Sequence, residues 1–174
     1  DVDNAYLSGS TNIVGDDYLI YCEKGFYDLK KEKGNFQKNA KINYDGKIIL
    51  GDSLFFEKSR EYASATNRVI INDTVNSSII YGHYGEVFKA KDSAIITKRA
   101  VALNIIENDS LFIHADTLVA TGPQDNRILR GYYDVRFFKK DVKGRSDSLF
   151  LNQQTGDIEL IKKPCLLYTS DAAD

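Results

Sequence analysis

The tetrapeptide Gly51-Asp52-Ser53-Leu54 returns as Ala115-Asp116-Thr117-Leu118 and again as Ser146-Asp147-Ser148-Leu149. An earlier copy opens with Gly15-Asp16, and Gly82-His83 stands where a degenerate copy falls. The marks recur about every 31 to 36 residues, and each is followed by a strand, a polar turn and another strand. The chain is therefore predicted to consist of strand-turn-strand repeats of roughly 30 residues.

Short runs rich in Ile, Val, Tyr, Phe and Thr alternate with turn residues along the chain, a pattern typical of β-strands. These runs are Asp17–Tyr21, Lys47–Leu50, Ser53–Phe56, Arg68–Asn72, Ser78–Tyr81, Ala94–Thr97, Leu103–Ile106, Ser110–His114, Asp134–Phe138 and Ser148–Asn152. Turn chemistry separates them, as in Tyr44-Asp45-Gly46 and Thr155-Gly156-Asp157. No long stretch keeps a helical apolar stripe, so the predicted fold class is all-β, with about a dozen strands.

A single module cannot bury its own apolar face, because isolated hairpins are only marginally stable in water. Stacking of successive modules solves this problem and predicts an elongated molecule. Within each mark we expect the Asp to accept backbone N–H bonds and the Leu to point into the core. Asp17–Tyr21 and Ser110–His114 carry apolar residues on both faces, which favours a sheet with a core on one side and an apolar partner on the other. A two-sheet sandwich with some exposed apolar residues remains an alternative.

The composition fits one soluble globular domain: 174 residues, 43% hydrophobic, with a net charge of −2. Positive and negative residues are interspersed, and the densest basic run, Lys30-Lys31-Glu32-Lys33, contains its own Glu. A nucleic-acid partner is therefore not expected, since phosphate binding requires clustered Lys and Arg.

Catalytic and metal-binding patterns are weak. His114 and Asp116 lie two residues apart on one predicted strand, but no third metal ligand is near them in sequence. Asp16 and Asp17 point to opposite faces of a strand and so cannot flank one glycosidic bond. We expect no catalytic residue, no metal site and no cofactor, and hence no enzyme. The eleven Tyr and nine Phe leave a carbohydrate-binding module open as an alternative.

Both ends of the sequence suggest a fragment. No Met is present, so we expect the natural start and any signal peptide to lie outside this sequence. The segment 165–174 resembles a translated sequencing adapter, and a genuine disordered tail is the alternative. The predicted organisation is one domain over residues 1–164 and a non-native tail over 165–174. Cys22 is then the only native cysteine, and no disulfide is expected.

An ordered set of segments gives the sequence a specific resemblance. They are Ile13–Asp16, Tyr21–Asp28, Leu50–Phe56, Asp109–Leu118 and Val135–Asp141. In these segments, from about Val14 to Pro164, the chain resembles the OstA-like (LptA-like) family of periplasmic lipopolysaccharide-transport proteins, in the form found in Bacteroidota. The resemblance implies an elongated, twisted β-jellyroll, slightly open along one side.

The resemblance also implies a function. The interior would hold the lipid A acyl chains of lipopolysaccharide, and other β-jellyroll proteins would join end to end, including an outer-membrane translocon. The location would be the periplasm, associated with the outer-membrane transport machinery. The alternative is a non-catalytic carbohydrate-binding or envelope-scaffold β module.

Strand alternation around the repeat marks predicts which side chains face the lipid. The predicted lipid-binding residues are Leu19, Tyr21, Leu54, Phe56, Ile80, Ile95, Leu111, Ile113, Leu118, Phe137, Leu149 and Leu151.

Overall fold

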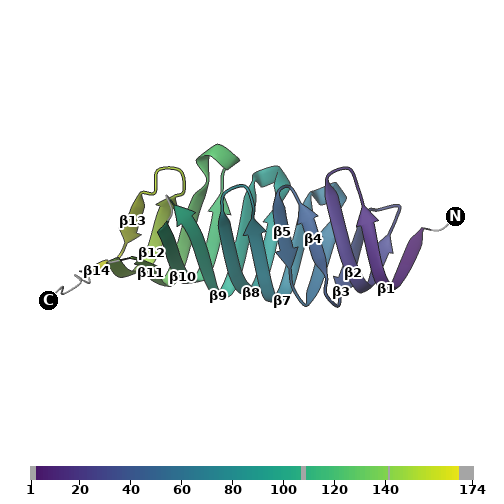
Figure 1. Ribbon diagram of the computed structural model, residues 1–174, viewed down its shortest axis with the longest axis horizontal. Coiled ribbons are helices and arrows are strands. Elements are labelled where there is room, and N and C mark those ends of the chain that lie inside the picture. Colours follow the sequence, from purple (N-terminus) through teal and green to yellow (C-terminus); the bar gives the residue numbers. More distant parts are fainter. Residues whose placement is uncertain (1–2, 107–108, 141, 169–174) are drawn as a thin grey trace.

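The computed structural model describes residues 3–106, 109–140 and 142–168, and these residues form an almost purely β structure (Figure 1). The strands are β1 (Asn4–Val14), β2 (Tyr18–Asp28), β3 (Lys33–Gln37), β4 (Lys41–Tyr44), β5 (Lys47–Leu50), β6 (Ser53–Glu57), β7 (Tyr62–Asp73), β8 (Ser78–Phe88), β9 (Ser93–Ile106), β10 (Asp109–Thr121), β11 (Ile128–Lys139), β12 (Val142–Asn152), β13 (Ile158–Ile161) and β14 (Cys165–Tyr168). Three single-turn 3₁₀ segments, η1 (Lys58–Arg60), η2 (Lys89–Lys91) and η3 (Gln124–Asn126), lie in connections. Within the described ranges no helix is long and apolar enough to span a membrane.

All strands pair antiparallel in one continuous sheet that is folded over on itself. The first half of β2 pairs with β4 and its second half with β3. In the same way β7 pairs with β6 in its first half and with β5 in its second. Each long strand therefore crosses from one layer of the fold to the other. We call the layer that contains β4, β5 and β14 layer one, and the layer that contains β3, β6 and β13 layer two.

The crossings between layers lie on one side of the molecule, which we call the corner seam. Register shifts mark them, for example between Thr66 and Val69 of β7. Pairs of consecutive non-glycine residues with positive φ lie at every second crossing: 38–39, 67–68, 98–99, 133–134 and 162–163. The repeat marks lie at the crossings between these pairs. There, the backbone N–H of Asp52 donates to the carbonyls of Thr66 and Asn67, and that of Asp147 donates to Lys162.

The repeat prediction is correct for the later marks but places the first one wrongly. Gly15 and Asp16 lie in the turn between β1 and β2, and the crossing of β2 falls at Cys22 and Glu23 instead. The Glu23 backbone N–H donates to the Lys38 carbonyl, which is the bond that Asp147 makes in its own module. The marks thus serve as corners, where the backbone N–H groups of Asp52 and Asp147 donate hydrogen bonds and the Asp52 carboxylate accepts from the Arg68 side chain instead of from a backbone N–H.

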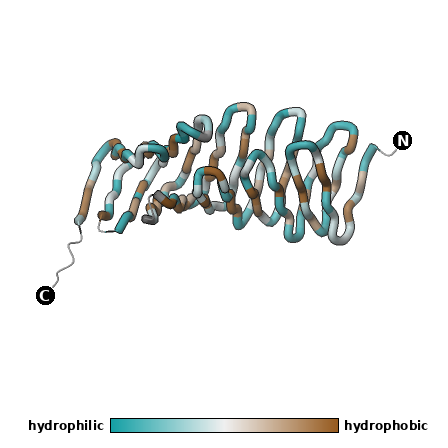
Figure 2. The backbone as a smooth tube through the Cα atoms, turned by 45° about the horizontal axis from the view of Figure 1, so that its top comes forward, coloured by the Kyte–Doolittle hydropathy of each residue, from teal (hydrophilic) through white to brown (hydrophobic). Residues whose placement is uncertain are grey.

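The hydrophobic core lies between the two layers. The ring of Phe56 in layer two packs against Tyr18 and Tyr44 of layer one, with ring centroids 4.6 and 5.3 Å apart. The Leu of each complete mark, Leu54, Leu118 and Leu149, is buried as predicted. Several of the bends at both edges of the chain trace are hydrophilic (Figure 2), so polar connections flank an apolar middle.

The predicted non-native tail is only partly described. Cys165–Tyr168 forms β14, which pairs with the first half of β12, and all four of its residues are exposed. Residues 169–174 of the predicted tail lie outside the described residues.

Candidate lipid-binding interior

Two in-register rows of apolar residues run along the inner faces of the layers. The layer-one row is Ile13, Ile20, Ile42, Ile49, Ile71, Ile80, Ala102, Ile113, Phe137 and Gly144. The layer-two row is Leu7, Gly25, Phe36, Leu54, Ala65, Gly85, Ile96, Leu118, Gly131, Leu149 and Leu160. Each residue is the direct cross-strand partner of the next, and neither row contains a polar side chain. Along these two rows the interior is therefore apolar without interruption from β1 to the last strands.

Nine of the twelve predicted lipid-binding residues point into this interior. They are Leu54, Phe56, Ile80, Leu111, Ile113, Leu118, Phe137, Leu149 and Leu151. The other three, Leu19, Tyr21 and Ile95, point outward, and Leu19 is 43% exposed. Their neighbours Ile20 and Ile96 occupy the inner face instead.

The three misplaced residues have two causes. In β2 the predicted residues Leu19 and Tyr21 lie three and five positions after Asp16, whereas the inward residues of a complete mark, such as Leu54 and Phe56, lie two and four positions after the Asp, and a shift of one residue reverses the facing. In β9 both Ile95 and Ile96 are apolar, so composition does not identify the inner face. The prediction does not include Ile42, Ile49 and Ile71, which are buried and whose β-branched side chains in strand-like runs are the signal available in the sequence.

The side opposite the corner seam, where hairpin turns of both layers lie, is the mouth of the fold. Polar side chains bridge the layers there. Lys89 of η2 lies 2.5 Å from the carboxylate of Asp17, and its ammonium lies 5.2 Å from the Tyr44 ring centroid. The hydrogen bond from Lys89 holds the pKa of Asp17 below its usual value. The mouth is thus closed by ionic and hydrogen-bonded contacts, which exchange with water more readily than a packed apolar seam.

A second bridge lies further along the mouth. The Arg127 side chain, just before β11 in layer two, lies 3.5 Å from the carboxylate of Asp73 at the end of β7 in layer one. Both partners are largely buried, and Asp73 also accepts bonds from the backbone N–H groups of Val75 and Asn76. Asp73 therefore stabilises both the turn that follows β7 and the contact between the two layers.

No family model and no curated protein sequence matches the chain. Nineteen chains of solved structures match its fold. One is the crystal structure of LptH from Pseudomonas aeruginosa, the LptA-homologous periplasmic component of the lipopolysaccharide transport device. It aligns with a TM-score of 0.64 and 8% identity, over 71% of this chain and 95% of LptH. The chain therefore has an LptA-like fold.

The LptA-like interior opens at its C-terminal end into an apolar hollow of about 400 Å³. Its lining residues are Phe137, Lys139, Val142, Ile158, Leu160, Pro164 and Leu166. Leu166 belongs to the segment predicted to be non-native. Leu160 ends the layer-two row here and Phe137 is the last side chain of the layer-one row before Gly144, so the hollow continues the interior.

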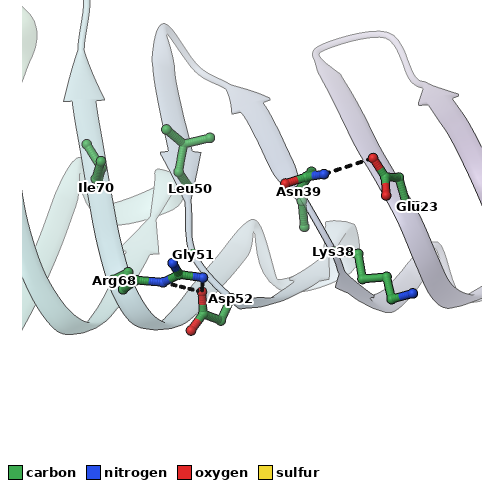
Figure 3. Close-up of a pocket in the computed structure, with 9 residues that line it drawn as sticks. Glu23, Lys38, Asn39, Leu50, Gly51, Asp52, Arg68 and Ile70 are labelled. Carbon is green, nitrogen blue, oxygen red and sulfur yellow. Dashed lines mark hydrogen bonds and ion pairs between the residues drawn. The ribbon is translucent and has the colours of Figure 1, made fainter.

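A larger hollow, of about 850 Å³, lies on the corner seam and has a different character (Figure 3). Arg68 Nε donates to Asp52 Oδ1 at 2.8 Å, and Asn39 Nδ2 donates to Glu23 Oε1 at 2.8 Å. Because charged and amide groups line it, acyl chains would be poorly solvated there. Among the described residues no group of three or more His, Cys, Asp or Glu is placed to hold a metal ion.

Proposed function

We propose that this chain is a lipid-carrying segment of a periplasmic lipopolysaccharide-transport bridge that ends at the outer membrane. The observation that supports this most directly is the pair of unbroken apolar rows. They line a molecule whose fold is shared with a component of the lipopolysaccharide transport device. Each acyl CH₂ group costs about 0.8 kcal/mol to expose to water, so a multi-chain lipid needs a continuous apolar path across an aqueous space.

The proposal requires the two layers to move apart. Phe56 and Ile113 are fully buried, so acyl chains enter only where the facing side chains of the two rows separate. The polar bridges at the mouth are the contacts that open, while the continuous strands at the corner seam keep the layers joined. Further β-jellyroll proteins would join at the ends, where strands offer unpaired edges.

The test is photo-crosslinking from an aliphatic diazirine amino acid at Ile113, in the natural full-length protein with lipopolysaccharide present. The matched control is Phe112, the adjacent residue, which points outward and is 42% exposed. We expect a lipid adduct at position 113 that excess lipopolysaccharide suppresses, and little adduct at 112. An adduct at 112 alone would contradict the carrier function.

A carbohydrate-binding module is the second candidate, and one observation favours it. Phe112 and Phe138 are direct cross-strand partners on the outer face of layer one, and both are exposed. Such a pair resembles an aromatic platform for a sugar ring. Glycan binding that Phe112→Ala abolishes, without any adduct at Ile113, would favour this function.

A further inference from the structure

The apolar interior ends at the mouth in a small polar cluster made of Asn104, Arg127 and Gln153, here called the mouth cluster. Asn104 comes from β9 in layer one, points inward and is 2% exposed. Gln153 follows β12 in layer two, and its Nε2 donates to Asn104 Oδ1 at 2.6 Å. The backbone N–H of Gln153 donates to the Arg127 carbonyl at 3.0 Å. Gln153 thus links the other two residues across the mouth.

Two buried hydrogen-bond donors of this cluster have no acceptor among the described residues. The guanidinium of Arg127, which is 4% exposed, donates from Nη1 to the Asp92 carbonyl at 2.8 Å and lies near Asp73 through Nη2. Within the described residues, Arg127 Nε and Asn104 Nδ2 have no partner. Both groups can only donate, so what they lack is an acceptor oxygen. Buried donors are nearly always satisfied, which points to a ligand atom at this place.

The surrounding charge indicates what kind of acceptor fits. The Asp73 carboxylate already offsets the Arg127 charge, and Asp125 lines the adjoining hollow of about 230 Å³. A phosphate would meet two carboxylates for one guanidinium, so a neutral oxygen fits better. The cross-strand partners of Asn104 are Ser78 and Leu111, both buried, and deeper along β10 the inner face continues with the apolar residues Ile113 and Ala115.

We infer that the mouth cluster binds the ester or amide carbonyl oxygens of an acylated lipid whose chains lie in the interior. A carbonyl is the neutral acceptor that stands where an acyl chain begins, at the boundary between apolar interior and polar mouth. The cluster would fix the depth of the lipid: chains inside, carbonyls at Asn104 and Arg127, headgroup outside. This inference rests on the proposed lipid-carrying function.

The experiment compares two probes with equal chain lengths, a diacyl phosphocholine and its dialkyl ether counterpart, which lacks the carbonyls. Binding to the purified chain is measured by calorimetry. We expect the unaltered chain to prefer the diacyl probe by about tenfold to hundredfold, the range of one or two buried hydrogen bonds. Asn104→Leu removes one donor, and Asn104→Asp replaces it while keeping the acceptor for Gln153. Both variants are expected to lose diacyl affinity and keep dialkyl affinity.

The matched control is Asn72→Leu, which makes the same change on the outer face of layer one. It is expected to keep the preference for the diacyl probe. Equal affinity of the unaltered chain for both probes would overturn the carbonyl site and leave the apolar interior standing. Binding of neither probe would overturn both proposals. Competition by inorganic phosphate that Asn104→Leu abolishes would replace the carbonyl site with an anion site.

Discussion

Tyr18 and Tyr27 lie at opposite ends of β2, yet their hydroxyl oxygens are 2.9 Å apart and share a hydrogen bond. A straight strand would separate residues nine positions apart by about 30 Å, so β2 is folded back on itself through its crossing at the corner seam. The bond therefore joins the two layers at the mouth, beside Glu32, which accepts from Tyr18 and from Lys58.

Tyr27→Phe should lower the free energy of unfolding by about 1 kcal/mol, because it leaves the Tyr18 hydroxyl with one fewer partner. Urea denaturation measures the change. Tyr6→Phe, at a highly exposed position, is the control and should have no measurable effect. If Tyr6→Phe lowered the free energy of unfolding as much as Tyr27→Phe, loss of the Tyr18–Tyr27 hydrogen bond would not be the cause of the effect.

Alkaline pH should destabilise the fold through the same pair. Burial raises the pKa of both Tyr18 and Tyr27 above the ordinary value of 10.0. Because the folded pKa exceeds the unfolded one, their contribution is complete below about pH 10 and is lost as the pH rises through the folded value. Denaturation between about pH 8 and pH 11 should show this fall. Tyr27→Phe should make it shallower, and an identical slope would contradict the prediction.

Substitution of the inward Ile113 should cost far more than substitution of its outward neighbour. Ile113→Ala removes a fully buried side chain and should lower the free energy of unfolding by about 2 to 5 kcal/mol. Phe112→Ala should cost clearly less. Thermal denaturation of both variants measures the two losses of stability. Equal losses would show that the outer face at Phe112 is packed as tightly as the inner face at Ile113. Charged residues at Ile113 are unsuitable as lipid-binding tests, since they would unfold the chain first.

Gly34→Ala should destabilise the fold by about 1 to 3 kcal/mol. A Cβ there would lie 2.3 Å from the Phe26 carbonyl oxygen, which is backbone and cannot move aside cheaply. Gly131→Ala is the matched control, since its Cβ would meet only ordinary contacts of 3.4 Å or more, with Leu118, Val135 and Ala115. Thermal denaturation should give a lower melting temperature for Gly34→Ala than for Gly131→Ala. Equal melting temperatures would contradict the prediction.

A linker across the mouth should block lipid uptake. Asp17→Cys and Lys89→Cys, joined by a cleavable bismaleimide, would hold the layers together where the native ion pair is reversible. Lipopolysaccharide uptake should fall after linking and return after cleavage. Linking Glu23→Cys to Asn39→Cys on the corner seam is the control and should leave uptake unchanged. Full uptake by the chain linked across the mouth would contradict entry by separation of the layers.

The sequence predicts the all-β class and the repeat because Leu54, Leu118 and Leu149 carry the same mark at the same place in the fold. It does not predict the crossing of β2, because Cys22-Glu23 lacks the Asp-Ser-Leu form that marks the later crossings. The facing within β2 was nevertheless predictable: two and four residues after Asp16, the offset of Leu54 and Phe56 from Asp52, stand Tyr18 and Ile20, which are both buried.

The mouth is the part that sequence patterns describe least. The partners Asp17 and Lys89 are 72 residues apart, and Asn104 and Gln153 are 49 apart. Charged and amide residues of this kind usually lie in solvated turns, so composition alone gives no reason to pair them. Only the folding of the sheet onto itself brings them together.

The strands run across the long axis of the molecule, and each is hydrogen-bonded to its neighbours along that axis (Figure 1). A tensile load between the two ends would therefore act on one ladder at a time and peel strands from an end. It would not shear many hydrogen bonds at once. Under tension such a molecule yields gradually and at low force, and it re-zips strand by strand when the load is released.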